Sequence, residues 1–386
     1  MPEALAGSNC NICYMVSVFS LPGPDGFDSW VSSARAEVEG RMEGVFSIPD
    51  FSGLRGTLGE AASLFDFQAL EALRGGKRLR ALLEMAASLC AGGKGGSEAA
   101  CAIEIFQAAA LVHDDIVDKA EIRRGKPSSR KAFLNSLSSP AFGPDSADAM
   151  AIMLGDFLAS ASIEALLEAH FGKNTFPAIR AFCRMQMQVE KGQILDIASP
   201  SLPLDDPWAL EEGIENIYLY KTASYTTVAP LILGFLEAGV EEAEAQKWGS
   251  AVGAPLGVAF QIADDLTDLE GGGKPKGADI REKKRTFLLS DSLSLLPLEE
   301  KKRLSSIYRE GKPEGNEEEV ISAFRKCGAV EKSHERIRDL WGKAVKSLRD
   351  CSSSLGISEE GTNFLGRAMA LFVPASDCRA VTPEFL

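Results

Sequence analysis

Three aspartates spaced over one helical turn are the most chemically suggestive residues, within the segment HDDIVDKAEIRRGKP. In a helix, Asp114 and Asp118 stand four residues apart, with Asp115 between them, so that all three carboxylates project from one face. Like charges this close repel one another and need either protons or a cation. Magnesium suits them, because it binds one or two carboxylates together with substrate phosphates. The forked guanidinium groups of Arg123 and Arg124, just behind, suit phosphate oxygens.

The same DDxxD spacing recurs in the segment QIADDLTD, where Asp264, Asp265 and Asp268 repeat the arrangement. A single cluster of this kind is compatible with a solvated acidic helix face. Two copies in a helical chain instead favour two carboxylate faces directed into one cavity, with metal ions between them. The pair therefore predicts a diphosphate that is held through its counter-ions.

Two basic segments add candidate phosphate ligands. The segment GGKRLR reads as a helix start, so we expect Lys77 and Arg80 to share a helix face near free N–H groups that favour anions. The glycine-rich segment GGGKPKGADIREKKRT follows the second aspartate cluster directly and carries Lys274, Lys276 and Lys284. A flexible basic loop in that position could close over a polyphosphate and exclude water. The alternative for both segments is a solvated charged surface.

Polar residues inside apolar helical segments are a further signal. Gln107 precedes Asp114 by two helical turns and should therefore look into the same cavity. The segment GQILD places a polar pair in an apolar helix, and Lys221 with Thr222 interrupts an apolar-aromatic segment. Buried polar groups need partners, so we expect these residues beside the cavity or on the surface.

The rest of the chain must position these groups, and its pattern is helical. Apolar residues recur at helical spacing, strong helix formers dominate, and no alternating β-branched run of strand length stands out. Gly, Pro and Ser clusters separate the segments. We expect an all-α, single-domain bundle of roughly a dozen helices. The clearest predicted helices are Ala61–Leu73, Ala99–Val112, Ala149–Ala169 and Phe176–Ile197.

Composition excludes several classes of protein. The chain has 41 basic and 55 acidic residues and a formal net charge of −14, which argues against a nucleic-acid partner. No run of about 18 apolar residues appears, so no membrane span is expected. The eight cysteines lack a disulfide spacing, and a cytoplasmic location is expected. Residues 1–28 lack the basic start of a signal peptide and read as a disordered extension before a domain over residues 29–386.

In this order, the motifs resemble those of the polyprenyl (isoprenyl) diphosphate synthase family, the trans-prenyltransferases. The likeness covers GGKRLR, Gln107, DDIVD with RRG, GQILD, KT, QIADDLTD, and GAD with KRT, from about Leu70 to Thr286. It implies the isoprenoid synthase type I fold, with a deep central cavity, and a homodimer. It also implies magnesium-assisted ionisation of an allylic diphosphate (dimethylallyl, geranyl or farnesyl) and 1'-4 coupling to isopentenyl diphosphate.

The resemblance also implies roles for individual residues. Three Mg²⁺ ions would be bound by Asp114, Asp118 and Asp264, supported by Asp115, Asp265 and Asp268. The allylic diphosphate would be held by Arg123, Lys221 and Lys284, with Lys274 joining on closure. Isopentenyl diphosphate would be held by Lys77, Arg80 and Arg124, assisted by Gln107. The allylic cation would be stabilised by Thr222, Gln261 and the Lys221 carbonyl, and the released diphosphate would accept the final proton.

Product length depends, in the resembled family, on bulk shortly before the first DDxxD. Here those positions are Ala109 and Ala110, both small, and Phe106 one turn deeper is the candidate floor. We expect geranylgeranyl diphosphate, with a longer polyprenyl diphosphate as the alternative.

Two other functions share parts of this pattern. A class I terpene cyclase has the all-α fold but usually replaces the second DDxxD and needs no isopentenyl diphosphate site, whereas this chain has QIADDLTD, GGKRLR and RRG. A non-catalytic subunit of a heteromeric synthase typically loses aspartates from these clusters, and none is missing here.

Overall fold

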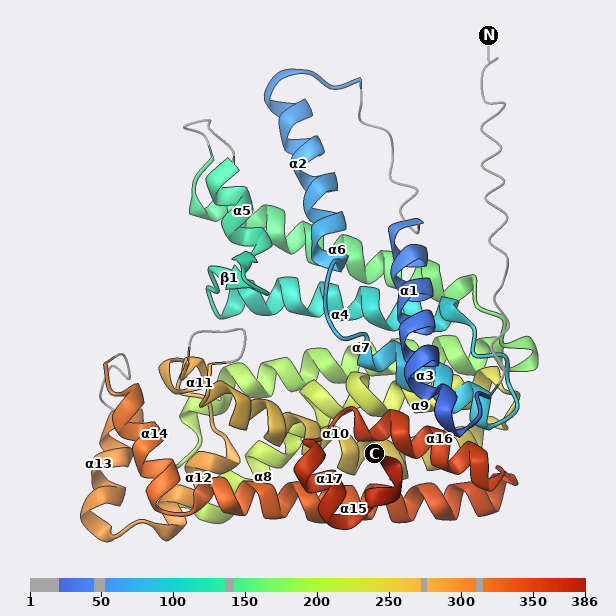
Figure 1. Cartoon of the computed structure of the whole chain (residues 1–386). Coiled ribbons are helices and arrows are strands. Elements are labelled where there is room, and N and C mark those ends of the chain that lie inside the picture. Colours follow the sequence, from blue (N-terminus) through green and yellow to red (C-terminus); the bar gives the residue numbers. More distant parts are fainter. Residues whose placement is uncertain (1–20, 45–52, 137–141, 272–275, 310–314) are drawn as a thin grey trace.

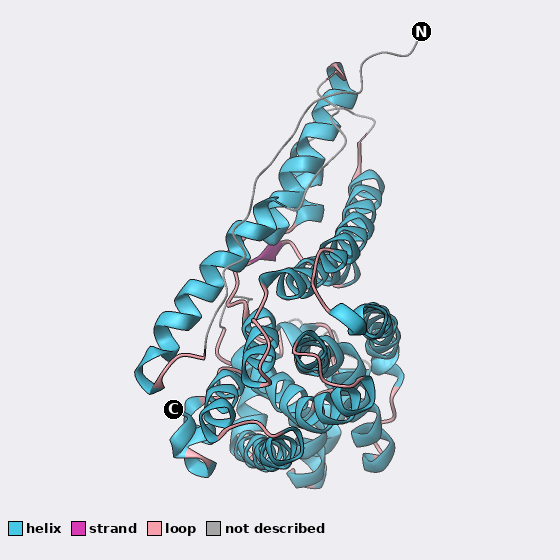
Figure 2. Cartoon of the chain, turned by 90° about the vertical axis from the view of Figure 1, so that its right-hand side faces the viewer, coloured by secondary structure: helices cyan, strands magenta, loops and turns pink. Residues whose placement is uncertain are grey.

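The computed structural model describes residues 21–44, 53–136, 142–271, 276–309 and 315–386, and this part of the chain is all-α, as predicted (Figure 1). Its one strand pair is a two-residue antiparallel ladder that joins β1 (Ile122–Arg123) to β2 (Lys126–Pro127). It is the magenta element in Figure 2 and lies in the IRRGKP segment.

Seventeen α-helices lie in the described residues. In chain order they are α1 (Phe27–Gly44), α2 (Gly56–Leu73), α3 (Leu79–Cys90), α4 (Ser97–Val117), α5 (Ser129–Ser136), α6 (Pro144–Leu167), α7 (Thr175–Ala198), α8 (Pro207–Ile217), α9 (Ala229–Glu237), α10 (Glu242–Asp268), α11 (Ala278–Arg281), α12 (Phe287–Leu295), α13 (Leu298–Arg309), α14 (Glu317–Lys326), α15 (Ala329–Leu355), α16 (Glu359–Ala370) and α17 (Ala375–Val381). Between α8 and α9 lies η4 (Tyr218–Val228), a π-helix.

The four helices predicted from apolar spacing are confirmed as parts of α2, α4, α6 and α7. The predicted third helix runs two residues beyond the observed end of α6 at Leu167. The described chain has more helices than the dozen expected, since several are short, among them α5, α11, α12 and α17.

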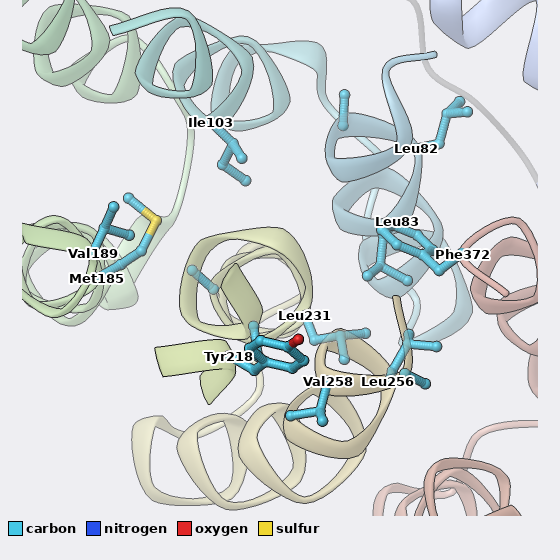
Figure 3. Packing of buried hydrophobic residues seen from close by; sticks show 14 of the residues in the cluster. Leu82, Leu83, Ile103, Met185, Val189, Tyr218, Leu231, Leu256, Val258 and Phe372 are labelled. Atoms are coloured by element: carbon cyan, nitrogen blue, oxygen red, sulfur yellow. The ribbon is translucent and has the colours of Figure 1, made fainter. Parts of the chain in front are cut away.

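The packing centres on two pairs of long helices. Helices α4 and α6 lie along one another in the upper half of Figure 1, and α10 packs against both α15 and the π-helix η4 below them. Continuous apolar burial holds these helices together, with Phe182, Phe235 and Trp341 among the largest fully buried side chains. Figure 3 shows part of this core, to which α3, α4, α7, η4, α9 and α10 all contribute.

Local capping fixes several helix starts. The Asp206 side chain accepts a hydrogen bond from the Ala209 N–H at 3.1 Å, and Pro207 follows at the first helical position. The Ser358 hydroxyl does the same for the Gly361 N–H at 3.1 Å. These caps satisfy backbone donors that helix geometry leaves unpaired, so the bundle's turns are specified locally.

One described helix, α6, is long and apolar enough by composition to cross a membrane, and 44% of its apolar window is buried. The sequence-based expectation of no apolar run of this length overlooked it, since small residues carry much of its hydropathy. Its inner face, with Ala151, Leu154 and Leu158, packs in the core beside α4, as in a core helix of a bundle.

Two regions named from the sequence lie outside the described residues: Lys274, and residues 1–20 of the expected extension. The boundary expected at residue 28 falls inside α1, which begins at Phe27. The Phe27 ring is buried and stands edge-on to the Phe364 ring, with centroids 5.6 Å apart. The division into extension and domain remains a prediction.

Candidate active site

A cavity of about 690 Å³ contains most of the residues singled out from the sequence. This volume is in the range of small-molecule sites. Aspartates near the C-terminal ends of α4 and α10 line one part of it, and Phe106, eight residues before Asp114 on α4, lines another. Eight residues of helix span about 12 Å, so the cavity is polar at one end and apolar at the other.

The first aspartate cluster divides between cavity and core. Asp114 lines the cavity and accepts hydrogen bonds from Lys221 Nζ at 3.1 Å and Gln193 Nε2 at 3.3 Å. Asp115 is buried and accepts from Arg123, whose Nε lies 2.9 Å from its Oδ1. Asp118 is the C-cap of α4 and lies 3.6 Å from Lys284 Nζ.

The second cluster lies at the end of α10, and Asp264, Asp265 and Asp268 all line the same cavity. Asp265 is buried and accepts hydrogen bonds from the Tyr218 hydroxyl and, at 2.9 Å, from Gln261 Nε2. Asp268 accepts the Ala278 N–H at 3.1 Å and so anchors the start of α11. Within each cluster the middle aspartate is therefore held by protein donors.

Two lysines pair with the aspartates. Lys221 Nζ lies 3.1 Å from Asp114 and 2.5 Å from Asp196, the acid of GQILD. Lys284 Nζ lies 2.7 Å from Glu282 and 3.6 Å from both Asp118 and Asp279. Burial opposes the charge on Lys221, but the two carboxylates outweigh it and raise its pKa. The pKa of Lys284 is raised for the same reason. Both lysines therefore stay protonated and available to a bound anion.

The pKa values of two carboxylates are raised as well, which in their case favours the neutral form. Burial raises the pKa of Asp118 to about 6, although Lys284 lowers it, and Asp114 adds repulsion. Burial also raises the pKa of Asp265 well above its usual value, reinforced by Asp279. Removing carboxylates from water disfavours their charged form, and a cation placed between them would restore it.

The π-helix η4 positions Lys221 and Thr222. Short π-helical segments are frequent at functional sites, because the wider turn redirects side chains. Helix α7 approaches η4 at Gly192, where an added Cβ would lie 2.2 Å from the Lys221 backbone nitrogen. A glycine is thus required for this contact, which brings Gln193 and Asp196 to the same cavity, as expected from GQILD.

The expected shared helix face of Lys77 and Arg80 is wrong. Arg78 has a left-handed backbone, with φ of 54°, and α3 begins only at Leu79, so Lys77 precedes the helix and is exposed. Arg80 is buried and donates to Thr226 Oγ1 at 2.9 Å, with its guanidinium 4.3 Å from the centre of the Tyr225 ring. Of the two, only Arg80 lines the cavity.

Gln107 and Arg124 lie at the same end of α3. Gln107 lines the cavity, as its spacing from Asp114 predicts, and in the amide orientation that satisfies both ends it accepts from Arg80 at 3.0 Å and donates to Glu104 at 3.1 Å. Arg124 also lines the cavity and donates to the carbonyls of Arg74 at 2.6 Å and Gly75 at 3.0 Å. It therefore braces the loop before α3.

The apolar end contains the three residues expected to govern product length. Phe106, Ala109 and Ala110 all line the cavity, opposite Val189 of α7. The Phe106 ring stands edge-on to the rings of Phe182 and Tyr225, with centroids 6.2 Å apart in each case. Phe106 is thus held in place by other aromatic side chains.

The aspartates have the oxygen ligands that a metal ion needs, although in this structure Asp114 and Asp118 lie next to lysines. Among the described residues, no three His, Cys, Asp or Glu side chains converge closely enough to form a ready-made metal site. Asp114 and Asp118 are each drawn to a lysine, while oxygen-only donors from two helices line one cavity. A hard cation with substrate phosphates as its other ligands matches that donor set.

Sequence reasoning missed Tyr218 and Arg285, which line the cavity, and the buried Arg78. Tyr218 reads as one more aromatic in an apolar segment, so no sequence signal separates it from core. Arg285 belongs to the KRT motif, and its position beside Lys284 was an available signal.

Fold and cavity together define an all-α bundle in which Asp114 of the first cluster and all three aspartates of the second line one cavity. The chain belongs to the polyprenyl synthetase family, whose model matches residues 67–327, more than half of the chain.

Similar proteins agree with this assignment. A geranylgeranyl diphosphate synthase of Saccharolobus solfataricus is 30% identical over 302 residues, covering 76% of this chain and 85% of that protein. An octaprenyl diphosphate synthase of Escherichia coli is 26% identical over 71% of this chain and 80% of its own length. A geranylgeranyl pyrophosphate synthase structure from Corynebacterium glutamicum, complexed with isoprenyl diphosphate and magnesium, superposes with a TM-score of 0.72 at 26% identity, covering 92% of this chain and 99% of that chain.

Proposed function

We propose that this protein is a trans-prenyltransferase that couples an allylic diphosphate to isopentenyl diphosphate. The observation that carries the proposal is the cavity itself, in which two aspartate clusters and two lysines occupy one end and Phe106, Ala109 and Ala110 occupy the other. Such a site suits a substrate with a charged head and an apolar tail. The named relatives, which are prenyl diphosphate synthases, support the same reaction.

Binding of the allylic diphosphate is assigned to the polar end. Asp114, Asp118 and Asp264 would hold magnesium, with Asp115, Asp265 and Asp268 in support; magnesium, when bound, supplies positive charge that stabilises the departing diphosphate. Lys221, Lys284 and Arg123 already lie within 4 Å of these carboxylates, so they can move onto phosphate oxygens with small displacements. The magnesium-bound structural relative supports this ion, and the count of three ions remains a proposal.

Isopentenyl diphosphate is assigned to the end of α3. Arg80 and Arg124 line the cavity there, and Lys77 is exposed next to them. Forked guanidinium groups are suited to two phosphate oxygens at once. Gln107 is hydrogen-bonded to Arg80 and would hold that guanidinium in place.

The reaction follows from the residue types. Lys221, Lys284 and Arg123 stabilise negative charge on the leaving diphosphate, and the allylic C–O bond ionises. Thr222 and Gln261, joined by a hydrogen bond of 2.6 Å, offer oxygens that stabilise the allylic cation without attacking it. The isopentenyl double bond then forms the new C–C bond, and the released diphosphate takes the proton.

The product proposed is geranylgeranyl diphosphate, with longer polyprenyl diphosphates as the alternative. Small side chains at Ala109 and Ala110 leave the cavity open beside α4, and Phe106 stands one turn deeper against two other aromatic rings. The relatives include makers of both lengths, which supports this range of products.

A homodimer is also proposed, in the cytoplasm. The adjacent exposed apolar side chains of Ile152 and Met153 on α6 support it, because exposed apolar surface is what a subunit contact would cover. Light scattering of the purified protein tests it: a dimeric mass is expected, and a Met153→Asp variant should shift toward the monomer.

The decisive experiment is a product analysis. Purified protein, Mg²⁺ and labelled isopentenyl diphosphate are incubated with dimethylallyl, geranyl or farnesyl diphosphate, and the dephosphorylated alcohols are separated by length. A dominant linear geranylgeraniol is expected. A cyclic hydrocarbon product would instead indicate a class I terpene cyclase. No product from a folded protein would indicate a non-catalytic subunit.

A further inference from the structure

Tyr218 stands at the head of a hydrogen-bond chain that ends in the cavity. Its hydroxyl donates to Asp265 Oδ2, while Gln261 Nε2 donates to Asp265 Oδ1 at 2.9 Å. Thr222 Oγ1 in turn donates to Gln261 Oε1 at 2.6 Å. The chain therefore links two residues of the π-helix η4 to two residues of α10, each pair four positions apart.

The donors and acceptors of this chain fix its direction. A carboxylate only accepts, so both the Tyr218 hydroxyl and the Gln261 amide must donate to Asp265. The Gln261 oxygen is then turned toward Thr222, and the single hydroxyl proton of Thr222 is occupied by it. Thr222 and Gln261 both line the cavity, and the hydrogen bond between them uses one lone pair of the Gln261 oxygen and none of the Thr222 oxygen.

Packing holds the Tyr218 ring rigidly. The side chain is 4% exposed, and its ring stands edge-on to that of Phe287 in α12, with centroids 5.4 Å apart and planes at 89°. Figure 3 shows Tyr218 within the buried cluster of the bundle. A ring fixed from behind gives its hydroxyl one direction, toward Asp265.

We propose that Tyr218 is a positioning residue for prenyl transfer: it fixes the Asp265 carboxylate, and through it the Gln261 amide and Thr222 hydroxyl, so that acceptor oxygens face the allylic cation. This rests on the proposed function. Without the Tyr218 hydroxyl, Asp265 Oδ2 has lost a buried donor, and the carboxylate is free to rotate. Gln261 then loses the acceptor that sets its amide orientation, and the alignment of Thr222 relaxes.

The test compares Tyr218→Phe with Tyr220→Phe, an exposed tyrosine two residues along the same π-helix. We expect the kcat of Tyr218→Phe to fall about tenfold, with KM for both substrates within about twofold, because the cation forms only after binding. Tyr220→Phe should match the wild type. Equal kcat values for the two variants would overturn the inference.

A double-mutant comparison separates this role from a structural one. Because Thr222 and Tyr218 stand at the two ends of one hydrogen-bond chain, the fall in kcat caused by Tyr218→Phe should be smaller in a Thr222→Val background than in the wild type. Additive losses would refute the proposal.

Failure of the inference is distinguishable from failure of the proposed function. If the wild type forms no elongated product, the proposed function fails. If the wild type is active, only the variants bear on Tyr218. Should Tyr218→Phe fail to fold, Thr222→Val tests the chain from its other end, with the same fall in kcat at unchanged KM expected and an unchanged kcat contradicting it.

Discussion

At the scale of single residues, the aspartates and lysines of the site are paired with one another and would change partners when a diphosphate binds. Asp114 contacts Lys221 at 3.1 Å and Asp118 lies 3.6 Å from Lys284, so each acid is close to the cation expected to contact the same diphosphate. Binding of a metal-complexed diphosphate would move the lysines from carboxylate to phosphate oxygens. Until the diphosphate binds, these ion pairs hold both the carboxylates and the ammonium groups in position.

Removing one of these acids should abolish most turnover. Asp114→Ala and Asp264→Ala are each expected to lower kcat by at least about 10²–10³-fold, since each removes charge stabilisation of the transition state. Circular dichroism should show an intact fold. Asp350→Asn, an exposed acid on α15, is the control. Near-normal turnover in a folded Asp114→Ala protein would contradict the assignment of Asp114 as a magnesium ligand.

How far the sequence predicts the site depends on whether a role is local. The DDxxD spacing predicts carboxylates at the ends of α4 and α10, because helix periodicity is a local property, but it does not predict that Asp115 turns to Arg123 while Asp114 lines the cavity. The expected pairing of Lys77 with Arg80 fails, since one left-handed residue, Arg78, delays the helix start. The role of Tyr218 depends on Asp265, 47 residues away, and no local pattern contains that contact.

At the scale of elements, four long helices were predictable and the π-helix η4 was not. Apolar spacing over many turns identifies α4 and α7, whereas eleven residues of mixed aromatic and polar character do not distinguish a π-helix from an α-helix. Tertiary contacts decide between these two kinds of helix. Gly192 of α7 and Gly257 of α10 both approach η4 so closely that a Cβ would overlap it.

That approach makes Gly192→Ala a test of how η4 is positioned. The added methyl group would lie 2.2 Å from the Lys221 nitrogen, so η4 must shift and take Lys221 and Thr222 with it. We expect kcat to fall by up to about 100-fold, as for small misplacements of reacting groups. Gly342→Ala is the matched control within a helix, because its Cβ would meet only Val381 at 3.8 Å. Equal kcat values for both variants would show that η4 tolerates displacement.

The wall that α4 contributes to the cavity should set product length. Ala110→Phe places a ring in the cavity one turn above Phe106, and we expect shorter products, measured as the chain-length distribution of the alcohols. Ala243→Phe, on an exposed position of α10, should leave the distribution unchanged. If Ala110→Phe gives the wild-type products, the growing chain does not pass along this helix.

At the scale of the whole molecule, one buried acidic side chain of the bundle lowers the free energy of unfolding. Glu84 of α3 is fully buried, and both carboxylate oxygens lack a hydrogen-bond partner. Burial raises the pKa of Glu84 well above its usual value, and Glu237 and Glu98 add repulsion. The folded protein therefore keeps this proton at pH values where the unfolded chain has lost it.

The sign of the pH dependence follows. Below pH 4.5, the usual pKa of a glutamate, both states are protonated and the titration of Glu84 does not change stability, whereas above it only the unfolded chain releases the proton and the free energy of unfolding decreases. Glu84→Gln removes this titration. Its stability relative to the wild type should therefore increase from about pH 5 upward, as measured by urea denaturation. Glu164→Gln, on an exposed position of α6, is the control, and a pH-independent difference for Glu84→Gln would contradict the assignment.

The pairing of Lys221 and Lys284 with acids also bears on the order in which ligands arrive. Asp114 of α4 and the aspartates at the end of α10 line the part of the cavity assigned to the diphosphate, and the protein as a whole carries a net charge of −14. We expect a bare diphosphate to be repelled by charges of its own sign, and a diphosphate that carries Mg²⁺ to be repelled less. The Mg²⁺ concentration in solution should therefore change how readily the diphosphate binds, in addition to its effect on the reaction itself.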